Sequence, residues 1–175
     1  KEDLFPIVKV RGELMEKAAR ALDTPGKAPA GMAAVLGLDY AAAVKALEAL
    51  QGEKVYLANY SSPSQVVLGG TGEGIQKAQE VFKAAGAKRY IVLKVSAPFH
   101  TPLLEQARVG LEQVLASVRF ADPAKPVYSN ASGRRIATGE EARRLCIEQA
   151  VSTVRWVDEE NSILADGFQR CLEVG

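Results

Sequence analysis

The chain has 175 residues, of which 47% are hydrophobic, and this is enough apolar material for one or two compact lobes. Its 22 basic and 21 acidic side chains nearly balance, which excludes the strongly basic surface of a general nucleic-acid binder. No apolar run approaches the roughly 20 residues of a membrane-spanning helix, and the first residues lack the layout of a signal peptide. Cys146 and Cys171 are too few for a disulfide framework or a zinc site. We therefore expect a cytoplasmic protein that holds no metal and binds neither nucleic acid nor membrane.

The first predicted element is an amphipathic helix over residues 4–22. Its apolar face carries one charged residue, and the face consists of Leu4, Ile7, Val8, Arg11, Leu14, Met15 and Ala18. Arg11 has two interpretations. It can lie at the edge of a core with its charged end in water, or it can offer a planar guanidinium to a carboxylate or phosphate. Prolines and glycines in residues 23–30 then end the helix.

From Gly31 onward, short apolar runs alternate with helical patterns. The predicted order is strand, helix, strand, strand, helix, strand, over residues 32–36, 40–50, 54–59, 65–68, 73–85 and 90–95. Asp39 precedes the first of these helices and is a good N-cap. This order predicts a small lobe of the split βαβ, ferredoxin-like type.

The remaining residues predict a second α/β set. A loop with two prolines covers residues 96–102, and the later elements are helices over 103–118, 140–150 and 157–168 with strands over 127–129 and 171–174. Strands buried on both faces need neighbours, and this set holds too few to make a sheet. We therefore expect that sequence is missing at both ends and that the small lobe is inserted in a larger α/β domain.

Few residues in this pattern indicate chemistry. His100 is the only histidine and follows Pro98 and Phe99 in a stiff loop, so it is either a structural loop residue or a general base that activates a hydroxyl. Asn59 and Gln65 lie around a hairpin, where polar side chains commonly serve the turn itself. The G-x-S-x-G motif of a serine nucleophile does not occur. The residues alone thus predict an α/β protein with one candidate histidine site.

Several segments in chain order resemble one family, the malonyl-CoA:acyl-carrier-protein transacylases of fatty-acid synthesis. The matching segments are Val-Arg-Gly-Glu-Leu-Met at 10–15, Gly-Met-Ala-Ala-Val-Leu-Gly-Leu at 31–38, the hairpin at 58–70, Val-Ser-Ala-Pro-Phe-His at 95–100, and residues 149–156. The resemblance covers essentially the whole chain. It implies an α/β-hydrolase-like large domain with an inserted ferredoxin-like lobe. Residues 1–26 and 97–175 would then belong to the large domain, incomplete at both ends, and residues 27–96 to the lobe.

The resemblance also implies roles for individual residues. His100 is the expected general base, and Gln149 is expected to offer its main-chain carbonyl to the other imidazole nitrogen. Arg11 is expected to form a bidentate pair with the malonyl carboxylate. Expected substrate-pocket residues are Asn59, Gln65 and Phe99, whose ring would crowd a branched acyl group. Coenzyme A enters only as the thioester substrate, no further cofactor is implied, and acyl carrier protein is the expected partner.

The family's serine nucleophile is expected upstream of Lys1, outside this chain. Its serine forms an acyl-enzyme that is attacked in turn by the carrier-protein thiol, with the histidine carrying the proton. This chain alone is therefore expected to be inactive. Two alternatives remain open, namely an acyltransferase domain of a polyketide or multifunctional synthase, and an inactive fragment that only binds acyl carrier protein.

Overall fold

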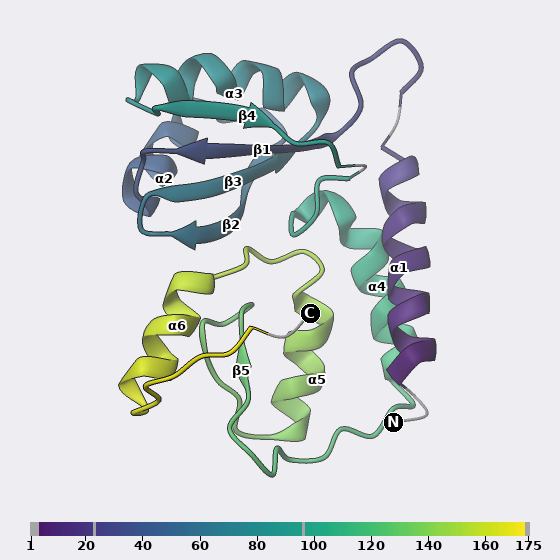
Figure 1. Ribbon diagram of the computed structural model, residues 1–175. Helices are drawn as coiled ribbons and strands as arrows, with labels where there is room; N and C mark the ends of the chain where they lie inside the picture. Colours follow the sequence, from purple (N-terminus) through teal and green to yellow (C-terminus); the bar gives the residue numbers. More distant parts are fainter. Residues whose placement is uncertain (1–3, 23, 96, 174–175) are drawn as a thin grey trace.

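The computed structural model describes residues 4–22, 24–95 and 97–173, which form two lobes (Figure 1). One lobe is a sheet covered by two helices, and the other is mainly helical. The chain leaves the helical lobe near residues 24–30, and the described residues 93–95 and 97–99 flank its return. The site described below lies where the returning chain meets the helical lobe.

The sheet lobe contains four strands and two helices in the predicted order. They are β1 (Gly31–Leu36), α2 (Tyr40–Glu48), β2 (Val55–Ser62), β3 (Gln65–Gly70), α3 (Gly72–Ala84) and β4 (Arg89–Val92). The strands lie in the order β2-β3-β1-β4, and every neighbouring pair is antiparallel. Asp39 caps α2 as expected, because its side chain accepts a hydrogen bond of 2.8 Å from the backbone N–H of Ala42.

The core of this lobe lies between α2, α3 and one face of the sheet. Alternate strand residues point to this face, including Val35, Leu57, Val66 and Leu68, and they pack against Phe82 of α3. The opposite face carries a second, smaller cluster of Met32, Ala34, Ala58 and Val67. The lobe therefore closes its main core with its own residues.

A β-bulge in β2 changes which side chains reach the second face. The register of β2 against β3 shifts between Leu57 and Asn59, so Ala58 is the extra residue of the bulge. At this point the chain segment around Val154 joins the edge of β2. Val154 donates its N–H to the carbonyl of Ala58 and accepts from the N–H of Tyr60, each at 2.8 Å. This short parallel bridge fastens the helical lobe to the sheet lobe.

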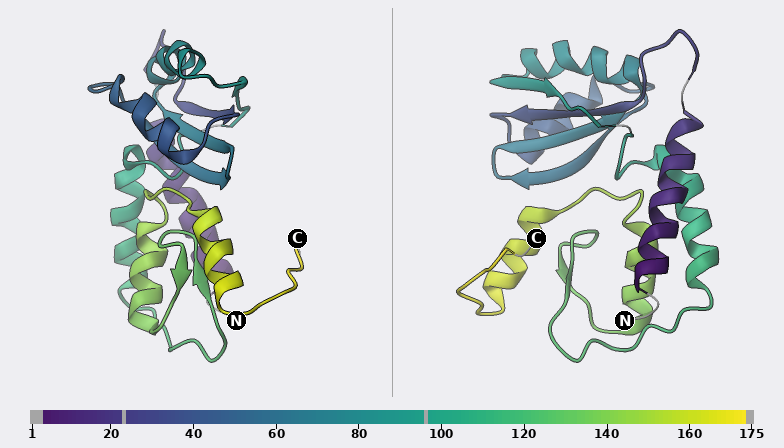
Figure 2. Two further views of the ribbon diagram at one scale, coloured as in Figure 1. Left: turned by 90° about the vertical axis from the view of Figure 1, so that its left-hand side faces the viewer. Right: turned by 45° about the vertical axis from the view of Figure 1, so that its right-hand side comes forward.

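The helical lobe is built around α1 (Leu4–Arg20) and α4 (Glu105–Leu115), which lie side by side (Figures 1 and 2). A 3₁₀ turn at Pro102–Leu104 precedes α4, so the helix predicted over 103–118 is real but begins as a tighter turn and is shorter. The remaining elements are β5 (Tyr128–Ser129), β6 (Arg134–Arg135), α5 (Gly139–Glu148) and α6 (Trp156–Ala165). No helix in the described ranges is long and apolar enough to cross a membrane.

Two predictions for this lobe are wrong. The start of α1 does not bury its apolar face, because Leu4 and Val8 are each 58% exposed, and only the second half of the helix packs into the core. The strand predicted over 171–174 is absent from residues 171–173, and residue 174 lies outside the described residues. Both segments need a neighbouring surface that the described residues do not provide.

Candidate functional site

The loop that carries His100 is held in a tightly fixed conformation. Among the described residues other than glycine, only His100 has a positive φ, of 59°, in the left-handed region that side chains seldom adopt. The next residue, Thr101, is fully buried and donates its hydroxyl to the carbonyl of Pro98 at 2.7 Å. Such backbone strain persists only when surrounding contacts determine it, and it is common at functional sites.

The sheet lobe helps to hold this loop. Gly69 of β3 lies so close to it that an added Cβ would stand 2.6 Å from Cγ2 of Thr101 and 3.4 Å from the carbonyl oxygen of Phe99. Only glycine permits this approach of the loop to the sheet. The close contact explains why the His100 loop and the end of the hairpin lie together.

The imidazole of His100 is oriented by the main chain of Gln149. Nδ1 of His100 lies 3.0 Å from the carbonyl oxygen of Gln149, which caps the C-terminus of α5. The last carbonyls of a helix have no partner within the helix, so this oxygen is free to accept. A carbonyl only accepts, hence Nδ1 carries the proton and Nε2 has its lone pair available.

The pKa of His100 is lowered from its ordinary value. Burial is the main cause, because it disfavours the charged form, and the positive charge of Arg11 acts in the same direction. The hydrogen bond to Gln149 opposes them and raises the pKa. The balance keeps the imidazole neutral at pH 7, which is the form that accepts a proton.

Arg11 is linked to the same glutamine through its side chain. Nη2 of Arg11 donates to Oε1 of Gln149 at 2.8 Å, and Nε2 of Gln149 donates in turn to Oδ1 of Asn130 at 3.4 Å. Arg11 comes from α1, Gln149 from the end of α5, and Asn130 from the turn after β5. Gln149 is therefore the residue that connects His100 and Arg11, with its main chain on one and its side chain on the other.

Two cavities adjoin these residues. Arg11 and Gln149 line one of about 290 Å³, together with Asn130, Cys146 and Glu159. His100 lines another of about 440 Å³ between the lobes, whose walls also include Tyr56, Pro102, Ser152 and Thr153. The site thus has one chamber beside the arginine and another beside the histidine.

The structure places the expected pocket residues unequally. Asn59 is the bridge partner of Val154, and its Oδ1 is buried without a hydrogen-bond partner among the described residues. Phe99 packs against both the helical core and the second face of the sheet, so it joins the two lobes next to His100. Gln65 pairs with Ser62 at the turn of the hairpin, four residues along β3 from Gly69, or about 13 Å away at the rise of a strand. The backbone does not bring Gln65 beside His100.

Three residues near the site had no signal in the sequence. Asn130 follows a short strand in an ordinary turn. Cys146 is half-buried, and burial raises the pKa of its thiol. Glu159 is only 8% exposed, and its Oε2 has no hydrogen-bond partner in the part of the chain that the structure describes. Burial raises the pKa of this carboxyl, and Glu160 adds to the effect. A glutamate in the first turn of a helix usually faces solvent, so the sequence pattern did not mark Glu159 as a buried residue.

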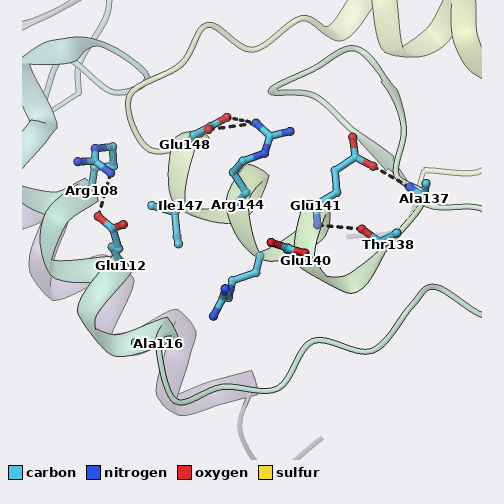
Figure 3. A pocket seen from close by; sticks show the side chains of 11 residues that line it. Arg108, Glu112, Ala116, Ala137, Thr138, Glu140, Glu141, Arg144, Ile147 and Glu148 are labelled. Carbon is cyan, nitrogen blue, oxygen red and sulfur yellow. Dashed lines mark hydrogen bonds and ion pairs between the residues drawn. The ribbon is translucent and has the colours of Figure 1, made fainter.

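A larger cavity, of about 690 Å³, lies elsewhere, between α4 and α5 (Figure 3). Two of its three arginines, Arg108 and Arg144, are already paired on their own helices. Arg108 contacts Glu112 at 3.1 Å and Arg144 contacts Glu148 at 2.9 Å, as the dashed lines in Figure 3 show. The cavity contains none of the strained or long-range contacts found around His100, so volume alone does not mark the site.

Taken together, fold and site define an α/β protein with a neutral, oriented histidine and an arginine joined through one glutamine. This arrangement can move a proton at Nε2 of His100 while Arg11 holds an anionic group nearby. It has no described cluster of His, Cys, Asp and Glu side chains that could hold a metal ion.

Comparison with known proteins shows which proteins the chain resembles. The chain is 36% identical, over 99% of its length, to a malonyl CoA-acyl carrier protein transacylase of Bacillus subtilis, and 34% identical, over the same share, to that of Escherichia coli. It covers 54% of each of these proteins. It is also 40% identical to the "Polyketide biosynthesis protein ThaF" of Burkholderia thailandensis, of which it covers 14%. No protein-family model matches the chain.

Solved structures of similarly named proteins also resemble the chain. An acyl carrier protein S-malonyltransferase from Vibrio cholerae matches with a TM-score of 0.84 and 34% identity, over 93% of this chain and 51% of the other. A malonyl-transacylase solved in complex with a type II polyketide acyl-carrier protein matches with a TM-score of 0.83 and 33% identity, over 93% and 51% of the two chains. The chain is therefore similar to the malonyl CoA-acyl carrier protein transacylases, and it matches the C-terminal part of these proteins over about half of their length.

Proposed function

We propose that the protein containing this chain transfers a malonyl group from malonyl-CoA to the phosphopantetheine thiol of acyl carrier protein. The observation that carries the proposal is the shared use of Gln149, whose carbonyl orients His100 and whose side chain holds Arg11. The reaction passes through an acyl-serine, and the serine lies outside this chain. We place the reaction in the cytoplasm, with no cofactor besides the coenzyme A thioester.

In the first half of the reaction, Nε2 of His100 takes the proton of the serine hydroxyl as its oxygen attacks the thioester carbonyl. The bond from carbon to sulfur breaks, and the imidazolium returns the proton to the coenzyme A thiolate. In the second half, the carrier-protein thiol gives its proton to His100 and attacks the acyl-serine carbonyl. The ester bond to the serine oxygen breaks, and the imidazolium returns the proton to that oxygen, which restores the serine hydroxyl. The fixed tautomer and the lowered pKa of His100 support this role.

Arg11 gives the preference for a malonyl group. Arg11 lines a cavity, and its guanidinium can form two parallel hydrogen bonds with the free carboxylate of the substrate. Phe99 and Asn59 belong to the walls near the reacting acyl group, whereas Gln65, at the far end of the hairpin, contributes less directly.

The architecture that we propose for the whole protein is an α/β-hydrolase-like domain with residues 27–96 inserted as a ferredoxin-like lobe. Residues 1–26 and 97–175 belong to the larger domain. The exposed apolar residues at the start of α1, with Phe5 80% exposed, then contact the remaining part of that domain. Without the serine, this chain alone does not catalyse the transfer.

A labelling experiment tests the proposal. The whole protein is incubated with radiolabelled malonyl-CoA, then with acyl carrier protein, and label is followed by gel electrophoresis. We expect covalent label on the enzyme that passes to the carrier protein, and its loss by about 10²–10⁴-fold in rate in His100→Ala. The 175-residue chain by itself is expected to take up no label. Label on that chain would refute the placement of the nucleophile, and transfer of acetyl but not malonyl groups would refute the substrate.

Replacing the arginine tests the substrate preference separately. We expect Arg11→Ala to lower kcat/KM for malonyl-CoA by about 100-fold, because the charge pair with the substrate carboxylate is lost. Transfer of acetyl groups, which have no free carboxylate, should change far less. Equal losses for the two substrates would contradict the proposed role of Arg11.

A second candidate function has one observation in its favour. The match to the polyketide biosynthesis protein has the higher identity, 40%, although the chain covers only 14% of that protein. In this alternative, the chain is part of an acyltransferase domain that loads a polyketide carrier protein. Kinetics with carrier proteins of the two pathways distinguish the candidates, since the true partner should give the higher kcat/KM.

A further inference from the structure

We propose that Gln149 and Asn130 are positioning residues for the substrate carboxylate, acting through Arg11. The inference rests on the proposed function and adds a role for the side chain of Gln149, beyond the use of its main-chain carbonyl. The side chain of Gln149 holds the guanidinium of Arg11, and Asn130 fixes the orientation of the Gln149 amide.

The direction of each hydrogen bond follows from the chemistry of the groups. A guanidinium only donates, so the atom of Gln149 that faces Arg11 at 2.8 Å is the oxygen, Oε1. The amide nitrogen of Gln149 then points to Asn130, where it meets the oxygen Oδ1 at 3.4 Å. If the Gln149 amide rotated by half a turn, its N–H groups would face the N–H groups of Arg11. The contact with Asn130 opposes that rotation.

The backbone around these residues is well fixed. The main-chain oxygen of Asn130 accepts a hydrogen bond of 2.7 Å from the N–H of Arg155, and the turn after β5 is closed by Gly133, whose N–H donates to the carbonyl of Ser129 at 2.7 Å. Gln149 donates its own N–H to Leu145 at 2.9 Å as the cap of α5. Asn130 and Gln149 therefore present their side chains from two anchored points of the helical lobe.

The geometry indicates that Gln149 orients Arg11 and does not compete with the substrate carboxylate for it. Only Nη2 of Arg11 is bonded in the described structure, so the guanidinium retains enough N–H groups for a two-bond pair with a carboxylate. Gln149 can thus stay bound while the substrate is present. A neutral amide also leaves the positive charge of Arg11 uncancelled, unlike a carboxylate at the same position. A guanidinium that is already held in one orientation loses less conformational entropy when the substrate binds than a freely moving one does.

The experiment uses the whole protein and the variant Gln149→Met. Methionine preserves the length of the side chain and leaves the main-chain carbonyl that orients His100. We expect KM for malonyl-CoA to rise about 10-fold, as for one lost hydrogen bond to a charged group, with a much smaller change in kcat. For acetyl-CoA we expect little change in either constant. The matched control is Gln113→Met, on the exposed face of α4, which should alter neither substrate.

Opposite outcomes overturn the inference. If Gln149 competed with the substrate, Gln149→Met would lower KM for malonyl-CoA, and if it were only structural, the two substrates would be affected equally. Asn130→Leu, which keeps the size of the side chain, is a second test and should shift the malonyl-to-acetyl ratio in the same direction by a smaller factor. A variant that changes no ratio contradicts the role of that residue.

A second measurement separates this inference from the proposed function. Hindered rotation of the Arg11 guanidinium can be followed by nitrogen NMR, with Arg11→Lys used to assign the signal. Faster rotation in Gln149→Met supports the hydrogen bond whatever the enzyme transfers, and unchanged rotation refutes it. If the unaltered protein transfers no malonyl group, the proposed function fails while the positioning of Arg11 is still decided by this signal.

Discussion

The two lobes differ in how they complete their cores. The sheet lobe, over residues 31–92, encloses a cluster that includes the fully buried Phe82 and Leu68. The helical lobe buries the second half of α1 against α4, yet it leaves Phe5 80% exposed and Leu164 59% exposed. The site belongs mostly to this more open lobe. Its contacts join positions 49 and 138 residues apart in the sequence, so it depends on long-range packing.

The sharpest test of this difference is a pair of phenylalanine substitutions. Phe82→Ala removes a large side chain from the core between α3 and the sheet, and we expect it to cost about 3–5 kcal/mol of unfolding free energy. Phe5→Ala removes the same group from an exposed position, and we expect a change within about 0.5 kcal/mol in this chain. Urea titration followed by circular dichroism measures both.

In the whole protein, the unfolding free energies lost in Phe82→Ala and in Phe5→Ala should become more similar. We proposed that the start of α1 contacts the rest of the large domain, so Phe5→Ala should become destabilising there. If Phe5→Ala costs as little in the whole protein as in the chain, α1 is exposed in both, and the proposed packing of the larger domain is wrong. If Phe82→Ala has little effect in the chain, the sheet lobe does not close its own core.

A pair of glycines sharpens the comparison at the point where the lobes meet. Gly69→Ala would place a methyl group 2.6 Å from Cγ2 of Thr101, whose side chain is buried and bonded to Pro98 and cannot move away easily. We expect a loss of about 1–3 kcal/mol and a displaced His100 loop. The control is Gly12→Ala on the exposed side of α1, with nothing within 4 Å of the added group. It should stabilise the chain by about 0.5–1 kcal/mol.

Thermal unfolding and the NMR signal of His100 report the two effects separately. A Gly69→Ala variant with unchanged stability and an unmoved His100 signal would show that the sheet does not hold the loop. Loss of stability without a change at His100 would place the strain within the sheet lobe.

Local patterns were enough to predict most of the sheet lobe. The short apolar run of β1, the cap at Asp39 and the glycines at the end of β3 are short-range signals, and the order of elements followed from them. The bulge at Ala58 has no such signal, since it depends on the pairing partner. Likewise, β2 continues to Ser62, because β3 provides partners that the sequence alone does not display.

The site was predictable only in part, and for a similar reason. His100 stood out as the single histidine in a proline-containing loop, and Arg11 as a charge on an apolar face, but nothing local joined them to Gln149. That link came from the resemblance to a family. The side-chain contacts from Gln149 to Arg11 and Asn130 depend on three separate elements, so no spacing in the sequence reveals them.

The smallest effect that we predict is electrostatic and concerns His100 alone. Because it is the only histidine, its ring protons give one resolved titration by NMR, free of overlap from other histidines. We expect a pKa below the ordinary value of about 6.5, chiefly because the ring is buried. The unfolded chain takes up this proton near pH 6.5, whereas the folded chain takes it up at lower pH. This residue's contribution to stability is therefore complete above about pH 6.5 and is lost as the pH falls through the folded pKa.

Arg11→Met should raise the pKa of His100 from this lowered value, since the nearby positive charge disfavours protonation. The control is Arg144→Met, whose partner Glu148 lies on the exposed side of α5 and whose loss should leave the titration unchanged. If Arg11→Met leaves the pKa of His100 unaltered, the charge of Arg11 does not act on the imidazole, and the two halves of the site are electrostatically independent. The whole protein should also retain malonyl transfer as the pH falls to the lowered pKa of His100. It should lose the activity below that pKa, because protonated His100 cannot accept the serine proton.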